Sequence, residues 1–144
     1  MILSVNTSRL EIDPQVVVRS TIGEGAELIG SRPSATENFP GPSAARNELI
    51  PAAAKPATNT VLARLPGGKL SYLEMVHPVD ACESWTVTGT ANTEIDHLLF
   101  QRKLEKGVIL KARVRAAIID RQADEDVALN AYLRFAATEP PLTV

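Results

Sequence analysis

The stretch from Val108 to Ile119 constrains the fold more than any other part of the sequence. Aliphatic side chains occupy every even position of this stretch: Val108, Leu110, Ala112, Val114, Ala116 and Ile118. Lys111, Arg113 and Arg115 occupy odd positions between them. Because successive side chains of a β-strand point to opposite faces, this period of two predicts a strand. We expect its even side chains in the core and its three basic side chains in solvent.

The same strand is predicted to pair with Glu94–Leu104 as a hairpin across Glu105–Gly107. Gly107 suits the left-handed position of a three-residue hairpin loop. In this register His97 lies opposite Arg115. A neighbouring cation disfavours the charged imidazole, so we expect His97 to be neutral near pH 7.

Earlier segments add further strands. Gln15–Thr21 is rich in β-branched residues, and Ser84–Gly89 alternates, with Trp85 on one face. Thr60–Leu65 and Leu70–Val76 flank the sequence Pro-Gly-Gly-Lys. Proline followed by glycine suits a type II turn, which predicts a second hairpin.

One helix is expected at the C-terminal end, from about Asp124 to Ala137. Acidic residues fill its first turn, where they interact favourably with the helix dipole. Its predicted buried face consists of Leu129, Tyr132, Leu133 and Ala136. The fold class is therefore mainly β (α+β by count), with an antiparallel sheet folded as a sandwich or open barrel and one C-terminal helix. A parallel sheet would need helical crossovers, which the middle of the chain does not supply.

The length of 144 residues predicts a single domain spanning residues 1–144, with an arm or insertion rich in Pro, Ala and Ser at about 31–59. Half of the ten prolines lie in this arm. Proline removes a backbone donor, so we expect no central strand there, and at most a short helix over Ser43–Ile50. Two interpretations of the arm stay open, a docked segment and a solvated insertion.

Composition limits the chemistry and the location of the chain. A single cysteine excludes a disulfide framework and a cysteine-based zinc site. The glycine pairs at 23–25 and 67–68 lack the spacing of phosphate-binding loops, so we interpret both as turns. No cofactor and no metal are expected. The start lacks the pattern of a secretory signal, and no apolar run approaches the ~20 residues that span a bilayer, so a cytoplasmic protein without membrane contact is expected.

Five residues are weak candidates for catalysis: His77, Asp80, Cys82, Asp96 and His97. An imidazole can lower a thiol pKa while a carboxylate orients the imidazole, and two histidines with carboxylates can hold a divalent metal. None of the spacings is diagnostic of a protease or metal site. Structural roles therefore explain these residues better.

A basic strand face is the binding candidate, formed by Lys111, Arg113 and Arg115. Seven of the fifteen lysines and arginines lie between residues 102 and 121, with only two acids among them. Such a ladder can neutralise phosphates. The net charge of -2 and the few aromatic residues argue against nucleic acid as the partner. Cross-strand pairing with carboxylates is the simpler explanation.

The leading functional hypothesis is a non-catalytic binding or assembly module that forms a homo-oligomer, with an unknown ligand or protein partner. The absence of a catalytic motif and the long arm motivate it, because unpaired sheet edges and exchanged arms join subunits. One alternative is a small enzyme or ligand carrier using His and Asp in a pocket under the sheet near Trp85. Another is binding of an anionic partner on the basic strand face.

Overall fold

A computed structural model describes residues 1–29, 31–33, 47–49, 59–100 and 103–139. The strands are β1 (Ile2–Val5), β2 (Glu11–Ile12), β3 (Val16–Gly23), β4 (Glu27–Ile29), β5 (Ser31–Pro33), β6 (Asn47–Leu49), β7 (Thr60–Arg64), β8 (Leu70–Val76), β9 (Ala81–Thr88), β10 (Asn92–Leu99), β11 (Leu104–Glu105) and β12 (Leu110–Asp120). The helix α1 spans Asp124–Ala136.

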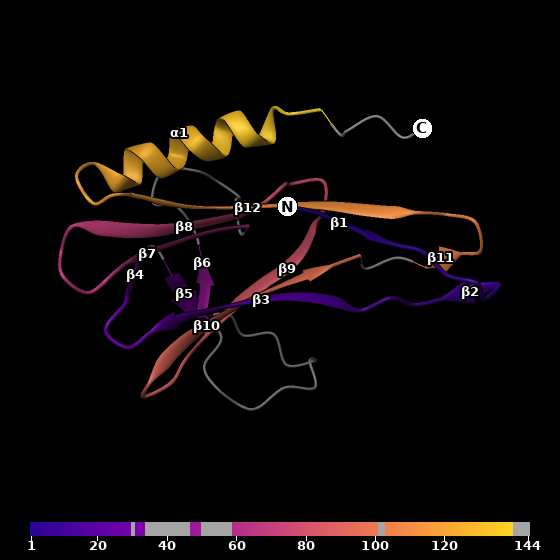
Figure 1. Ribbon diagram of the computed structural model, residues 1–144, viewed down its shortest axis with the longest axis horizontal. Helices are drawn as coiled ribbons and strands as arrows, with labels where there is room; N and C mark the ends of the chain where they lie inside the picture. The colour runs from indigo at the N-terminus through magenta and orange to yellow at the C-terminus, as the bar shows by residue number, and fades with distance from the viewer. Residues whose placement is uncertain (30, 34–46, 50–58, 101–102, 140–144) are drawn as a thin grey trace.

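The strands form two main sheets, and every strand pair is antiparallel. The first sheet has the order β1-β12-β8-β7-β4, and the second has the order β3-β10-β9-β6-β5. Strands β11 and β2 form a small separate pair. Figure 1 shows α1 along one side of the first sheet and β3, β9 and β10 on its other side. The prediction of a mainly β, antiparallel fold with one C-terminal helix is confirmed, and the sheets are open.

The predicted hairpin between β10 and β12 is wrong. Strand β10 pairs with β3 and β9, whereas β12 pairs with β1 and β8. The turn at Gly107 exists, with φ 85 and a 3.1 Å bond from the Val108 N–H to the Glu105 carbonyl, but it joins β11 to β12. The chain leaves the second sheet at Phe100, whose φ is 63. Apolar faces of two strands can meet across two sheets as well as within one sheet, and periodicity does not distinguish these arrangements.

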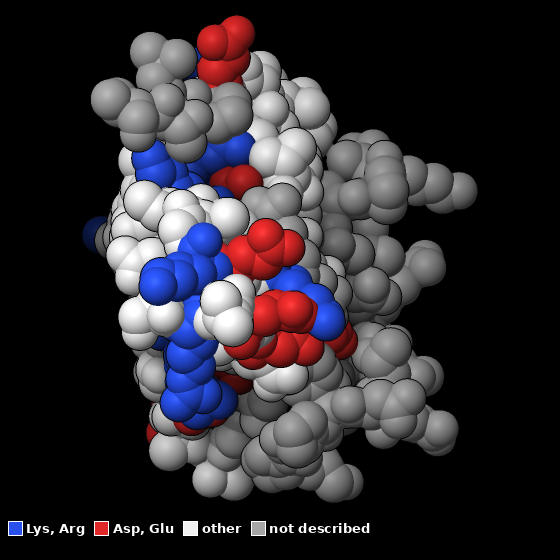
Figure 2. All heavy atoms as spheres, turned by 90° about the vertical axis from the view of Figure 1, so that its right-hand side faces the viewer, with Lys and Arg blue, Asp and Glu red and all other residues white. Residues whose placement is uncertain are grey.

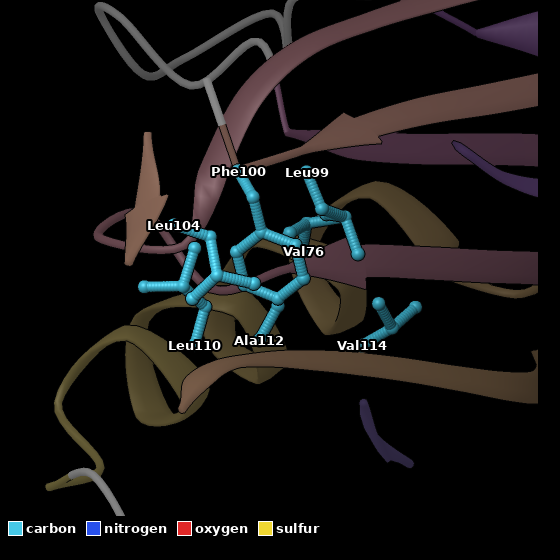
Figure 3. Close-up of a cluster of buried hydrophobic side chains, with 7 residues drawn as sticks. All are labelled: Val76, Leu99, Phe100, Leu104, Leu110, Ala112 and Val114. Carbon is cyan, nitrogen blue, oxygen red and sulfur yellow. The ribbon is translucent and has the colours of Figure 1, made fainter. Parts of the chain in front are cut away.

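The two sheets enclose a core cluster of seven buried residues, drawn in Figure 3: Val76, Leu99, Phe100, Leu104, Leu110, Ala112 and Val114. Strands β10 and β12 therefore touch through their side chains rather than through their backbones. The even positions of β12 are buried as predicted at Leu110, Ala112 and Val114.

Beyond Val114 the prediction for the even positions fails. Ala116 is exposed, and Ile118 is 56% exposed. Val108, which lies before the strand begins, is 41% exposed. The core residues of the second sheet that meet β12 cluster with its first half. An alternating sequence shows which face of a strand is apolar, but not how far the opposing layer extends along it.

Helix α1 confirms the predicted helix within one residue, but its buried face differs. Ala128, Tyr132 and Phe135 pack on Leu62, Leu73 and Met75 of the first sheet. Leu133 is 54% exposed, so its predicted burial is wrong. The reason lies at the first residue of the helix. Asp124 is bound to Arg64 and Ser71 on the sheet, which turns the face that contains Asp124, Ala128 and Tyr132 inward.

Two short strands interrupt the proline-rich arm. Strand β5 pairs with β6, and β6 joins β9 through Asn47 and Thr86. The short helix expected over Ser43–Ile50 is therefore wrong at residues 47–49. The expectation of no central strand within 31–59 is wrong for β6, which lies between β9 and β5, whereas β5 is an edge strand. Residues 30, 34–46 and 50–58 lie outside the described part of the chain, so the two interpretations of the arm, docked or solvated, both stay open.

Within the part of the chain that the structure describes, no helix has the length and apolar character needed to span a membrane.

Candidate functional site

A group of polar side chains lies between the two sheets. It consists of Ser20 on β3, Tyr72 and Glu74 on β8, Ser84 on β9 and His97 on β10, and we call it the inter-sheet polar cluster. Glu74 is its centre. One carboxylate oxygen accepts a 3.0 Å hydrogen bond from the Ser20 hydroxyl, and the other accepts a 2.7 Å bond from the Tyr72 hydroxyl. These bonds link the first sheet to the edge strand of the second.

Ser84 and His97 form the other half of this cluster. Ser84 Oγ lies 2.6 Å from His97 Nδ1, and His97 Nε2 lies 3.7 Å from Glu74 Oε1. Serine, imidazole and carboxylate are thus aligned in the order that nucleophilic hydrolases use. The second distance is longer than a hydrogen bond, and Nε2 is buried without a hydrogen-bond partner. All three side chains are buried, with His97 0% exposed.

Burial dominates the electrostatics of this cluster. It lowers the pKa of His97 to about 4, although Asp96 acts in the opposite direction. Burial also raises the pKa of Glu74, and the bonds from Tyr72 and Ser20 oppose that effect. An imidazole with so low a pKa takes up a proton poorly at neutral pH, which makes it a weak general base. The arrangement is better suited to holding two sheets together than to activating Ser84.

The expected neutral state of His97 agrees with this lowered pKa, but for a different reason. His97 lies opposite Val18 and Ser84, whereas Arg115 lies opposite Met75 in the other sheet. Removal of the imidazole from water, rather than a cation beside it, disfavours its charged form.

A second polar cluster lies where the ends of β8 and α1 meet β12. Here Arg113 binds Asp80, with Nε 2.8 Å from Oδ2, and its backbone N–H donates to the same oxygen at 3.0 Å. A second guanidinium nitrogen, Nη2, lies 2.8 Å from His77 Nδ1, and Nη1 donates to the Thr138 carbonyl at 3.0 Å. Because arginine is only a donor, His77 Nδ1 accepts and its proton lies on Nε2.

The His77 ring packs edge-on against Phe135, with 5.4 Å between ring centroids. Burial and the charge of Arg113 lower the pKa of His77. The backbone carbonyls of Ala136 and Thr138 raise this pKa. Nε2 of His77 nevertheless donates no hydrogen bond of good geometry to a described residue. This cluster attaches the C-terminal end of α1 to the first sheet.

The structure brings only some of the predicted catalytic residues together. His77 and Asp80 meet through Arg113, while His97 lies in the other cluster. Asp96 points to the opposite face of β10 from His97 and binds Arg19 through two 2.8 Å bonds. Cys82 is exposed on β9. Among the described residues no three His, Cys, Asp or Glu side chains are grouped to hold a metal ion.

Glu74 and Ser84 are not among the site residues predicted from the sequence. A signal was present, because Glu74 interrupts the otherwise apolar run Leu73–Val76 at a position that faces the second sheet. A carboxylate at a core position of a predicted strand indicates buried hydrogen-bonding partners.

The basic strand face is interrupted. Arg113 is 7% exposed and paired, so its predicted position in solvent is wrong. Both faces of β12 are covered there, one by the second sheet and the other by α1. Arg115 is exposed, with its guanidinium carbon 4.8 Å from the centre of the Phe135 ring. Figure 2 shows basic and acidic side chains next to one another on one end of the molecule.

Among the described strands, none pairs with the outer edge of the second half of β12. Strand β1 covers β12 only as far as Val114, whose N–H and carbonyl bond the carbonyl and amino group of Met1 at 3.0 and 2.8 Å. From Arg115 to Asp120 no described strand lies on this side. We call this segment the free half of β12. Its four middle residues, Ala116–Ile119, are uncharged and apolar.

The described residues define a class by architecture alone: a protein of two facing antiparallel sheets with one covering helix and a buried polar cluster between the sheets. Comparison with family models, curated proteins and solved structures finds no match to this chain.

Proposed function

We propose that this protein is a non-catalytic assembly module that associates with its own kind by adding a strand to an open sheet edge. The free half of β12 is the observation that carries the proposal. In natural proteins, charged side chains, proline or β-bulges prevent edge strands from pairing with other chains, and an apolar edge without them pairs with other strands. Ala116–Ile119 carries none of these devices on a strand that already belongs to a stable sheet.

The other long edge is better protected. Strand β3 is paired with β10 along all eight residues and forms the margin of the second sheet. Its middle residue Arg19 binds Asp96 and lies 3.3 Å from Glu94, so a charged network occupies the solvent face of this margin. Charged side chains at an edge oppose the addition of another strand.

Light scattering after size-exclusion chromatography tests the proposal. We expect the mass of the full chain to rise from monomer to oligomer over a concentration series up to roughly 1 mM, the range of weak association. Ile118→Lys should return the protein to a monomer, because it places a charge on the apolar edge. Ile109→Lys is the matched control, since Ile109 is 53% exposed but lies just before β12.

A strict monomer at every concentration would refute the proposal. Equal loss of association in both lysine variants would show that the interface does not lie at the edge of β12.

The enzyme alternative has one supporting observation, the 2.6 Å contact between Ser84 and His97. It is tested by turnover of activated esters by the full chain and by Ser84→Ala. The alternative requires turnover that Ser84→Ala abolishes, and equal rates in both proteins would remove it.

Binding of an anionic partner would now depend on Lys111 and Arg115, because Arg113 is committed to Asp80. Heparin retention that falls steeply with salt, and that is lost in a Lys111→Ser, Arg115→Ser variant, would support it.

A further inference from the structure

We infer that the His77 ring is an acid-sensitive anchor of α1. It holds the C-terminal turn of the helix on the first sheet while it is neutral, and it releases this turn when it takes up a proton. The first turn of α1 and the sheet stay in place. This inference goes beyond the proposed function and does not depend on it, because the anchor lies within one chain.

The sheet holds the backbone of His77, and the helix covers its ring. The His77 N–H donates to the Arg113 carbonyl at 3.0 Å, and the His77 carbonyl accepts from the Asp80 N–H at 2.8 Å. The ring packs edge-on against Phe135, and His77 is 3% exposed. Because the backbone is fixed to β12, the ring reaches water when the last turn of α1 moves away from the sheet.

Protonation of the ring removes the contact that holds it. In the attached state, Nδ1 of His77 accepts from Nη2 of Arg113 at 2.8 Å. An imidazolium carries a proton on both nitrogens, so two donors and two positive charges would then face each other. Arg113 stays in place, because Asp80 binds its Nε at 2.8 Å and its backbone N–H at 3.0 Å. The ring is therefore the group that leaves.

The other groups around the ring do not offset this repulsion. Asp80 is the carboxylate that favours a charged ring, and it is already bound to Arg113. From the helix side, the ring meets the uncharged ring of Phe135 and the carbonyls of Ala136 and Thr138. Charged side chains that neighbour these residues in the sequence are exposed: Arg115, Arg134 and Glu139.

The direction of the pH response follows from the lowered pKa of His77. Burial and the charge of Arg113 hold the pKa of the attached ring below its ordinary value of 6.5. As the pH falls below 6.5, the released ring takes up a proton before the attached ring, so the released population grows. A proton that binds only the released state changes this equilibrium by up to about tenfold per pH unit.

The first turn of α1 stays attached over the same pH range. Hydrogen bonds from Arg64 lower the pKa of Asp124 to about 2, so this ion pair persists at pH 4.5. Ala128 and Tyr132 pack on apolar side chains of the first sheet, and these contacts do not change in acid. Acid therefore loosens the helix from its C-terminal end.

Thiol labelling along α1 tests this inference in a Cys82→Ser background. Ala136→Cys reports on the last turn, and Ala131→Cys is the matched control, because both alanines are half-buried against the same apolar cluster. A pyridyl disulfide labels each variant between pH 7 and pH 4.5, and the ratio of the two rates cancels the common pH dependence of the thiols. We expect this ratio, position 136 over position 131, to rise at least ~3-fold as the pH falls.

Two further measurements assign the change to His77. NMR titration of the His77 ring in the unsubstituted protein should have the same midpoint as the labelling ratio. In His77→Asn, the side-chain carbonyl can accept from Arg113 but does not titrate in this range, so the ratio should stay constant.

Three results would overturn the inference. The first is a constant ratio in the presence of His77, including one in which both positions become reactive together. The second is an equal rise of the ratio in His77→Asn. The third is a labelling midpoint that differs from the NMR midpoint of the His77 ring, and this comparison needs no substitution at position 77.

Discussion

Asp124 anchors the first turn of α1 to the first sheet, and replacing it tests how the helix is held. Its carboxylate binds Arg64 through two bonds, 2.9 Å from Nε and 3.0 Å from Nη2, and accepts a 2.7 Å bond from the Ser71 hydroxyl. The side chain is 2% exposed. Asp124→Asn keeps the shape but removes the charge, so the bidentate ion pair and the interaction with the helix dipole are lost together.

The pKa of Asp124 gives the magnitude. Hydrogen bonds from Arg64 lower it from 3.8 to about 2, against the effect of burial. At about 1.36 kcal/mol for each pH unit, this difference corresponds to about 2 kcal/mol of folding free energy at pH 7. We therefore expect the Asp124→Asn variant to unfold with about 2 kcal/mol less free energy than the parent protein.

The sign of the pH dependence follows from the lowered pKa. The unfolded chain takes up the proton first as the pH falls, so the stabilisation is complete above about pH 5 and roughly half remains near pH 3. It disappears as the pH falls through the folded pKa of about 2. The difference between parent and variant should shrink in the same window.

Urea unfolding followed by circular dichroism at several pH values measures this difference. Asp126→Asn is the control, because Asp126 is exposed in the same helical turn. The Asp126→Asn substitution should lower the free energy of unfolding by only about 0.3–1 kcal/mol, because it removes only the interaction with the helix dipole. Equal effects of the two substitutions at pH 7, or a difference for Asp124→Asn that persists at pH 2, would refute the assignment of an ion-pair anchor.

Three further predictions concern other parts of the molecule. Asp80→Ala leaves the buried Arg113 cation without its carboxylate and should lower the unfolding free energy by about 3 kcal/mol in urea titrations; a loss below about 1 kcal/mol would contradict the buried pairing. NMR titration of His97 should show a neutral ring at pH 7 and a midpoint of about 4, and stability should fall as the pH decreases from 6.5 towards that value, because the unfolded chain protonates first. A midpoint near 6.5 would show that the ring is solvated. Ala123→Gly should raise Tm by about 2 °C by calorimetry, because Ala123 has φ 58 before the helix and glycine adopts this conformation without strain; an unchanged or lower Tm would argue against that strain.

Local patterns predicted the elements of this fold well. The strand Leu70–Val76 has the predicted bounds, and the turn between β7 and β8 has positive φ at Gly67, as the Pro-Gly sequence requires. The helix begins at Asp124, as its acidic first turn indicates. These features depend on neighbours within a few residues, and the sequence displays such neighbours directly.

Strand pairing and the polar clusters depend on distant contacts, and the sequence leaves them open. His97 and Ser84 are brought together by the register of β9 and β10, and Glu74 reaches them only because β8 faces that sheet. Arg113 was predicted to be solvent-exposed because one face of its strand was expected to be in contact with water. A helix that packs over that face changes the environment of the side chain completely.

The two faces of β12 explain why burial and exposure change along a single strand. Its first half lies between two layers, which permits a buried Arg113 on one face and buried Ala112 and Val114 on the other. In the described part of the structure, neither β1 nor the core of the second sheet extends over its second half, and its sequence stays apolar there at Ala116 and Ile118. Exposed apolar residues on an unpaired strand edge make association favourable. A segment with this composition in this position is stabilised when another strand covers it, because the added strand pairs its backbone and removes Ala116 and Ile118 from water.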